Sequence, residues 1–158
     1  MTIGMHFALT PDEVRRLRDC PDAESRIELV IEEFEEELVG TERAFGTDKA
    51  WYAIAECLCM DAEDTAPLQL VIYGGEDLGT DDDLLALVTP AQCLDVAEAM
   101  AAFGEDQFRA NYGRLDPEEY PIKSDEDLEY TLENLRGLDE FFRGAGEAGR
   151  FVLFSVLG

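Results

Sequence analysis

Histidine and serine are scarce among the residues that carry enzyme chemistry. The 158 residues contain one histidine, His6, and three serines. A Ser–His or Cys–His nucleophile pair would therefore have to use His6 as its base, and His6 lies in a strand-like segment where a structural role is the simpler interpretation. No glycine-rich phosphate loop, dinucleotide fingerprint, histidine-pair metal helix or calcium-loop pattern is present. The sequence therefore predicts no cofactor.

Lysine and arginine are scarce as well. Twelve basic residues stand against 37 acidic ones, and the formal net charge is −25. This balance excludes nucleic acid as a partner, because phosphates are held mainly by Lys and Arg, and it repels an anionic membrane surface. It attracts basic proteins, polyamines or divalent cations. The alternative is that the charge only keeps the protein soluble or reflects a salt-tolerant proteome. The oligomeric state is not predicted.

Long apolar runs are missing too. None approaches the roughly 18–20 residues that cross a bilayer, and the N-terminal segment has no signal-peptide features. We therefore expect no membrane association and a cytoplasmic location. In that compartment the four cysteines, Cys20, Cys57, Cys59 and Cys93, are expected to be reduced thiols, several of them buried. A thiolate nucleophile at Cys57 or Cys59 is an open alternative. A metal pair at these two is not expected, because helical residues two apart point in nearly opposite directions.

The hydrophobic pattern predicts one domain, residues 1–158, of the α/β (α+β-like) class. The last segment, Phe151–Leu157, is almost wholly apolar and predicts a strand buried on both faces. Thr10 and Thr89 each precede a proline and a third-position acceptor, which is typical of a capped helix. We expect a small mixed sheet of about three or four strands covered by helices. The strands are predicted near residues 3–9, 69–73, 84–88 and 150–157, and the helices near 11–18, 22–39, 49–59, 90–103, 105–112 and 125–143.

An acidic loop is the candidate cation site. Hard cations such as calcium and magnesium take several carboxylate oxygens from a flexible backbone. The loop offers five carboxylates, from Glu76, Asp77, Asp81, Asp82 and Asp83. Their spacing matches no known cage, and the alternative is that they are solvated surface charges.

The second candidate site is a ligand pocket around Trp51. Asp48 is predicted to cap the helix that holds Trp51, and Lys49 adds a charge beside this large aromatic. Gly74 and Gly75 form a turn of the kind that lets backbone approach a ligand closely. The alternative is that Trp51 is a core residue beside a structural ion pair.

Short motifs along the whole chain suggest a family. They are Ile3-Gly4-Met5, Leu9-Thr10-Pro11-Asp12-Glu13-Val14, Asp48-Lys49-x-Trp51, Tyr73-Gly74-Gly75, Leu87-Val88-Thr89-Pro90, Tyr120-Pro121 and Leu138-x-x-Phe141-Phe142-Arg143. With these motifs in this order, the chain resembles the YfbM-like family of bacterial proteins, which is grouped as a domain of unknown function. In that family a histidine often lies one turn after the tryptophan, where this chain has Ala55. The resemblance implies an α/β fold with a small sheet and peripheral helices, and it implies no activity and no catalytic residues.

Two functions agree with these observations. The first, which we favour, is a non-enzymatic binding protein whose acidic surface meets a basic protein. The second is an enzyme or small-molecule binder with a pocket near Trp51 and Gly74-Gly75, assisted by a cation at the acidic loop.

Overall fold

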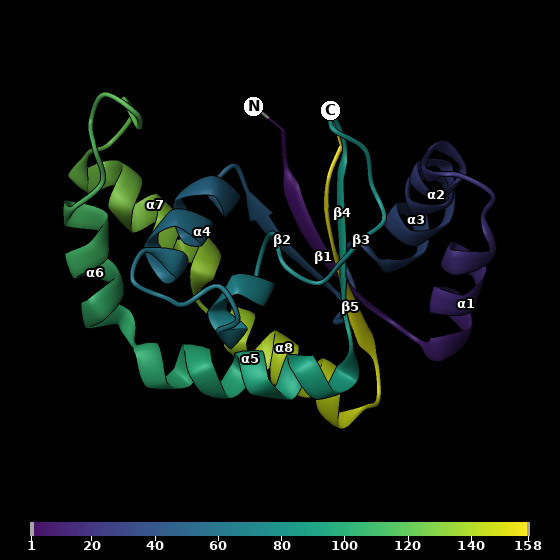
Figure 1. Cartoon of the computed structure of the whole chain (residues 1–158). Coiled ribbons are helices and arrows are strands. Elements are labelled where there is room, and N and C mark those ends of the chain that lie inside the picture. The colour runs from purple at the N-terminus through teal and green to yellow at the C-terminus, as the bar shows by residue number, and fades with distance from the viewer. Residues whose placement is uncertain (1, 158) are drawn as a thin grey trace.

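The computed structural model describes residues 2–157 as a sheet between two layers of helices (Figure 1). The sheet contains β1 (Gly4–Leu9), β2 (Ala44–Asp48), β3 (Glu76–Asp77), β4 (Leu84–Val88) and β5 (Phe151–Val156), in the order β2-β1-β5-β4-β3. One face is covered by α1 (Pro11–Asp19), α2 (Ala23–Leu29) and α3 (Glu35–Leu38). The other is covered by α4 (Trp51–Cys59), α5 (Pro90–Phe103), α6 (Glu105–Gly113), α7 (Asp125–Leu135) and α8 (Leu138–Glu147).

Every strand pairing in the sheet is antiparallel, so the predicted mixed sheet is wrong. The sheet has five strands, and the predictions near 3–9, 84–88 and 150–157 are confirmed as β1, β4 and β5. β5 pairs with β1 on one side and with β4 on the other, and nearly all of its residues are buried. The final segment is therefore the central strand, buried on both faces as its composition predicts.

The apolar segment 69–73 is not a strand, contrary to the prediction. It begins in a short 3₁₀ helix, Pro67–Leu70, and continues as a turn. Val71 and Ile72 are buried in the core on the α4–α8 side. The carbonyl of Val71 accepts a hydrogen bond from Nε2 of His6 at 2.8 Å. The segment is apolar because it is buried in the core. In a strand, the carbonyl of Val71 would bond to the backbone of a neighbouring strand, whereas here it bonds to the side chain of His6.

The helix caps expected at Thr10 and Thr89 are present. The hydroxyl of Thr10 accepts from the Glu13 backbone, while the Glu13 carboxylate accepts from the Thr10 N–H. Thr89 and Gln92 form the same reciprocal pair at the start of α5. Each pair satisfies two backbone donors that have no partner inside the helix. Both helices therefore begin where the sequence predicts.

Three predicted helices differ from the structure in detail. The helix predicted for 22–39 runs through α2, a π-helical segment (Val30–Phe34) and α3. The one predicted for 125–143 is two helices, α7 and α8, and α8 continues to Glu147. The one predicted for 49–59 begins at Trp51 with Ala50 as its N-cap. Asp48 therefore ends a strand and caps no helix.

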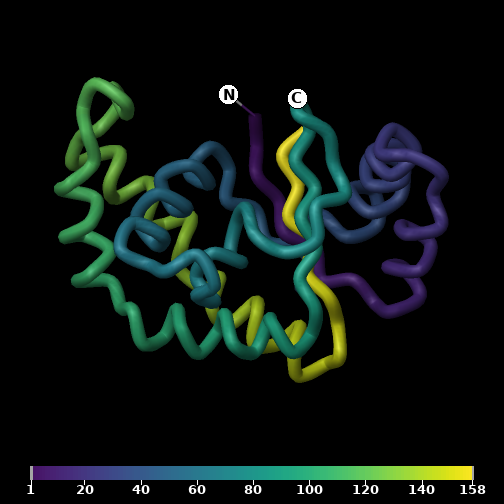
Figure 2. Tube along the Cα trace, in the orientation of Figure 1, coloured from purple at the N-terminus to yellow at the C-terminus, as the bar shows by residue number. Residues whose placement is uncertain are grey.

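Side chains of the sheet alternate between two cores. Phe7 and Leu9 of β1 contact the α1–α3 layer, while His6 and Ala8 face the α4–α8 layer. Both chain ends lie at the same end of the sheet (Figure 2). Among the described residues, no helix has the length and apolar character needed to cross a membrane.

Candidate functional site

Asp48 and Lys49 form a corner that ties β2 to α7. Asp48 has φ +47°, a left-handed conformation that aspartate tolerates better than most residues. The hydroxyl of Tyr130 accepts a hydrogen bond from the Lys49 N–H at 3.1 Å and donates one to the Asp48 carboxylate. Both residues are exposed, and neither lines the groove that contains Trp51.

Gly74 and Gly75 are explained by close packing. A Cβ on Gly74 would lie 2.5 Å from the carbonyl oxygen of Gln69, and one on Gly75 would lie 2.4 Å from that of Leu87. Gly75 also has φ +97°, which side chains disfavour. The two glycines let the chain turn tightly into β3, and they do not line the Trp51 groove either.

Trp51 lines an open groove of about 440 Å³, which we call the Trp51 groove. Its walls are Thr2, Trp51, Tyr52, Tyr73, Thr80, Asp81, Asp82, Leu84 and Val156. The indole is half-buried, and its Nε1 donates to the carbonyl of Thr2 at 3.0 Å. The rings of Tyr52 and Tyr73 stand at 86° and 90° to the indole, with centroids 6.2 and 6.3 Å away. The groove therefore combines three aromatic rings with two carboxylates from the acidic loop.

The acidic loop is a tight β3–β4 hairpin. The N–H of Thr80 donates to the Asp83 carbonyl at 2.8 Å, and the Thr80 hydroxyl accepts from the N–H groups of Asp82 and Asp83. Glu76 forms an ion pair with Arg18. Within residues 2–157, no group of three or more His, Cys, Asp or Glu side chains is placed to hold a metal ion. The hairpin does not gather its carboxylates into a cage, and two of them line the Trp51 groove.

A larger groove lies on the opposite face of the sheet, and we call it the α2–α3 groove. It has a volume of about 790 Å³ and is lined by Thr2, Ile3, Met5, Ile31, Glu35, Glu36, Val39, Ser155 and Leu157. Ile3, Ile31 and Val39 are 54%, 45% and 51% exposed. Ile31 belongs to the π-helical segment, a feature that is frequent at functional sites. Partial burial, with a smaller effect of Glu36, raises the pKa of Glu35.

This groove was not predicted from the sequence, although the sequence contains a signal for it. Val30 and Ile31 are adjacent, as are Leu38 and Val39. One face of a helix cannot bury both members of an adjacent apolar pair. In the structure Val30 and Leu38 are buried, while Ile31 and Val39 are exposed.

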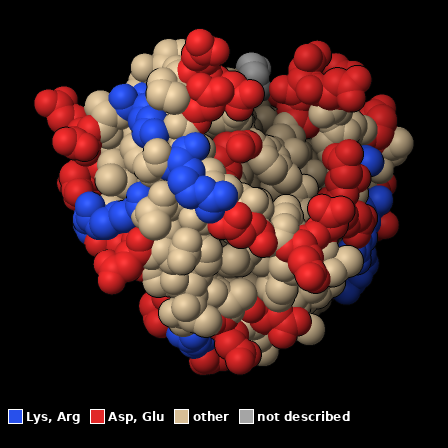
Figure 3. Space-filling view, turned by 60° about the vertical axis from the view of Figure 1, so that its left-hand side comes forward, with Lys and Arg blue, Asp and Glu red and all other residues tan. Residues whose placement is uncertain are grey.

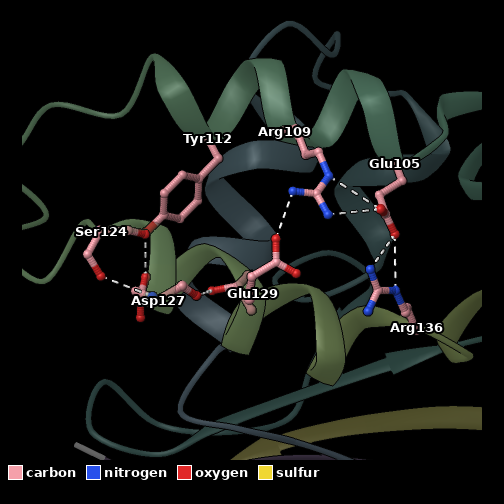
Figure 4. Close-up of polar contacts among 8 residues, drawn as sticks. Glu105, Arg109, Tyr112, Ser124, Asp127, Glu129 and Arg136 are labelled. Carbon is pink, nitrogen blue, oxygen red and sulfur yellow. Dashed lines mark hydrogen bonds and ion pairs between the residues drawn. The ribbon is translucent and has the colours of Figure 1, made fainter.

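A polar network joins α6 to α7 (Figure 4). The hydroxyls of Tyr112 and Tyr120 both donate to Oδ2 of Asp127, at 2.6 and 2.7 Å, and we call these three residues the tyrosine–aspartate network. Burial, and then the hydrogen bond to Asp127, raises the pKa of both tyrosines. Beside it, Arg109 bridges Glu105 and Glu129. The contacts of Tyr112 with Asp127 and of Arg109 with Glu129 hold the two helices together across a loop, and no sequence spacing indicates them. The Arg109–Glu105 pair lies within α6, at a spacing of four residues.

The groups with nucleophile or base chemistry are mostly buried. Burial lowers the pKa of His6 to about 4, opposed by the hydrogen bond to Val71. Burial raises the pKa of the Cys57 and Cys93 thiols to about 12, and that of Cys59 to about 11. A thiol is nucleophilic as the thiolate, so burial holds these cysteines in the less reactive thiol form near neutral pH. His6 is neutral there and is enclosed by the core.

The basic side chains are largely neutralised by ion pairs. Eight of the twelve contact a carboxylate, namely Arg15, Arg16, Arg18, Arg43, Arg109, Arg114, Arg136 and Arg143. Most of these pairs are exposed, and such pairs contribute little to stability. On the face in Figure 3, acidic side chains surround a central uncharged area, with smaller groups of Lys and Arg among them. The excess acidic side chains thus leave a negative surface.

Comparisons with known proteins place the chain in a family. A family model described as "Domain of unknown function (DUF1877)" matches residues 1–155. The crystal structure of YfbM from Escherichia coli, described as a protein of unknown function, superposes with a TM-score of 0.69 at 18% identity. The match covers 98% of this chain and 99% of that one. No curated protein matches the chain. The resemblance predicted from the motifs is therefore confirmed, and the chain belongs to the DUF1877 family of YfbM-like proteins.

Proposed function

We propose that the protein is a non-enzymatic binding module that holds a basic, amphipathic segment of another protein in the α2–α3 groove. The observation that carries the proposal is the concentration of exposed aliphatic side chains there: Ile3, Ile31 and Val39. Large exposed apolar residues that gather at one concave site mark interaction surfaces. Glu35 and Glu36 add carboxylates to the same groove.

Charge selects the kind of partner. The outer surface of α2 and the π-helical segment adds three exposed glutamates, Glu24, Glu28 and Glu32. An apolar groove beside carboxylates is complementary to a helix with one aliphatic face and one Lys/Arg face. A second copy of this chain is disfavoured, because two molecules of charge −25 repel each other. The burial of His6 and of the Cys57 and Cys93 thiols supports a binding role over nucleophilic catalysis.

The test is a binding titration with a defined probe. We would measure the fluorescence anisotropy of a labelled amphipathic Lys/Leu helical peptide, with a scrambled peptide of equal charge as the reference. Ile31→Ser/Val39→Ser removes aliphatic contacts of the groove and is expected to weaken binding about tenfold, because each lost contact is worth roughly 1 kcal/mol or less. Ile122→Ser is the control, since Ile122 is at least as exposed as Ile31 and Val39, at 55%, and lies outside the groove.

Four further outcomes decide the proposal. Binding should weaken as salt rises, because exposed charges are screened within about 8 Å at physiological ionic strength. The proposal fails if the scrambled peptide binds as tightly, or if the groove variant and Ile122→Ser behave alike. It also fails if sedimentation shows a dimer of wild-type protein that Ile31→Ser/Val39→Ser dissociates. That result would assign the groove to a second copy.

A further inference from the structure

The Trp51 groove combines aromatic rings and carboxylates in a way that the proposed function does not use. Trp51 and Tyr52 come from α4, Tyr73 comes from the turn before β3, and Asp81 and Asp82 come from the hairpin tip. These segments are distant in sequence and meet only through the fold. The groove lies on the face of the sheet opposite the α2–α3 groove, so its ligand can differ in kind.

The ring arrangement suits a cation. The faces of Trp and Tyr carry negative electrostatic potential, and a cation within about 6 Å of a ring centroid is attracted to it. Both tyrosine rings stand almost perpendicular to the indole of Trp51, so the three rings present aromatic surface in more than one direction. Leu84 and Val156 add an apolar wall. A cation that carries alkyl groups can contact the rings and this wall together.

The electrostatic surroundings are negative. Asp81 and Asp82 line the groove themselves. The carboxylate of Glu56, followed by burial, raises the pKa of Tyr52. Burial, followed by Glu56, raises the pKa of Tyr73 to about 12. A third carboxylate therefore lies close to the rings, and a positive charge in the groove would be stabilised from several sides.

We propose that the Trp51 groove binds an organic ammonium cation whose nitrogen carries methyl or methylene groups. The cation contacts the faces of Trp51 and Tyr73 and is paired with the carboxylates of Asp81 and Asp82. The volume of about 440 Å³ lies within the range of small-molecule sites, roughly 300–1,000 Å³. This inference is independent of the α2–α3 groove, and either can fail without the other.

The chain supplies its own reporter, because Trp51 is its one tryptophan. We would titrate the protein with choline and follow tryptophan fluorescence, using 3,3-dimethylbutan-1-ol as the neutral molecule of the same shape. We expect a saturable change with choline and none with the alcohol at equal concentration. Asp81→Asn/Asp82→Asn is expected to raise the Kd for choline about tenfold, because the ammonium group loses both of the exposed carboxylates that pair with it.

Matched variants separate the groove from general surface charge and from loss of folding. Glu24→Gln/Glu28→Gln makes the same change in net charge on the opposite face of the sheet, and it should leave the Kd unchanged. Tyr73 is 48% exposed. Tyr73→Phe should therefore fold and bind like wild type, and Tyr73→Leu should fold but bind at least several-fold more weakly, because it has no ring.

The result that overturns the inference is equal response to choline and to the alcohol, or an unchanged Kd in Tyr73→Leu and in Asp81→Asn/Asp82→Asn. A peptide with one trimethyllysine distinguishes the source of the cation. Tighter binding of the peptide than of choline assigns the site to a modified lysine of a partner protein. Tighter binding of choline assigns it to a free small molecule. Both results retain the ammonium chemistry.

Discussion

His6 makes the stability of the fold depend on pH, by an amount that follows from its surroundings. The ring is completely buried against Phe141, Phe142 and Phe154. Its Nε2 donates to the carbonyl of Val71, while Nδ1 has no hydrogen-bond partner in the described part of the chain. A second proton would place an unpaired charge in this apolar site. Burial therefore lowers the pKa of His6 from 6.5 to about 4.

The sign of the effect follows from where each state binds the proton. The unfolded chain is protonated at His6 below about pH 6.5, whereas the folded protein is protonated only near pH 4. The stabilisation is fully present above the unfolded pKa and is lost as the pH falls toward the folded value. This difference in pKa lowers the free energy of unfolding by about 2 kcal/mol between pH 7 and pH 5, and by about 3 kcal/mol below pH 4.

The measurement has to separate His6 from the 37 acidic residues, which titrate in an overlapping range. We would measure the free energy of unfolding in urea for wild type and for His6→Gln, each at pH 7 and pH 5. The change with pH in the difference between the two proteins is the contribution of His6. We expect His6→Gln to be the less stable protein at pH 7 and the gap to narrow by about 2 kcal/mol at pH 5. NMR titration of the single histidine gives its folded pKa directly. A folded pKa near 6.5, or a gap that does not change with pH, would refute the reasoning.

Three further perturbations test the packing. Gly75→Ala should destabilise the folded protein by about 1–3 kcal/mol, because the φ of Gly75 is +97° and the carbonyl oxygen of Leu87 lies 2.4 Å from the added Cβ. Gly113→Ala should not destabilise it, because the added Cβ meets nothing within 4 Å. Equal melting temperatures of the two variants would contradict this prediction. Tyr120→Phe removes one donor of the tyrosine–aspartate network and should cost about 1–3 kcal/mol in urea unfolding, and no loss would show that the hydrogen bond does not stabilise the fold. Ellman's reagent should label the half-buried Cys20 in the native protein and reach the buried Cys93 only after unfolding; equal rates would contradict the burial of Cys93.

Local signals in the sequence were sufficient for much of the fold. The caps at Thr10 and Thr89 are made by residues three apart, so their partners can be read from the sequence. The central strand β5 is recognisable because six of the seven residues Phe151–Leu157 are apolar. The segment 69–73 was wrongly predicted to be a strand, because a buried turn has the same apolar composition as a buried strand. β2 and β3 were not predicted, and both are edge strands of the sheet. β2 is short and is interrupted by Gly46, and β3 is only two residues long.

The candidate sites depend on contacts that local sequence patterns do not encode. The sequence singled out Trp51 by its rarity and the acidic loop by its charge, and the fold places Asp81 and Asp82 of that loop in the Trp51 groove. Asp48 was predicted as a cap because aspartate favours that position. Here its left-handed backbone and its bond to Tyr130, 82 positions along the chain, give it another role.

The two grooves share one wall, because alternate side chains at the same strand ends face opposite sides of the sheet. Thr2 lines both, Ser155 and Leu157 line the α2–α3 groove, and Val156 lines the Trp51 groove. The pairing of β1 with β2 has a bulge between Gly4 and Met5, two residues after Thr2.

Gly4→Ala tests this shared wall, because its Cβ would lie 2.6 Å from Oγ1 of Thr47 and 3.0 Å from the ring of Phe154. The start of β1, or the side chains of Thr47 and Phe154, must shift to relieve these contacts. We therefore expect Gly4→Ala to weaken the binding of both the amphipathic peptide and choline, in protein that remains folded by circular dichroism. Ile31→Ser/Val39→Ser should affect only the peptide, and Tyr73→Leu only choline. If Gly4→Ala changed one affinity and left the other at its wild-type value, the two grooves would be structurally independent.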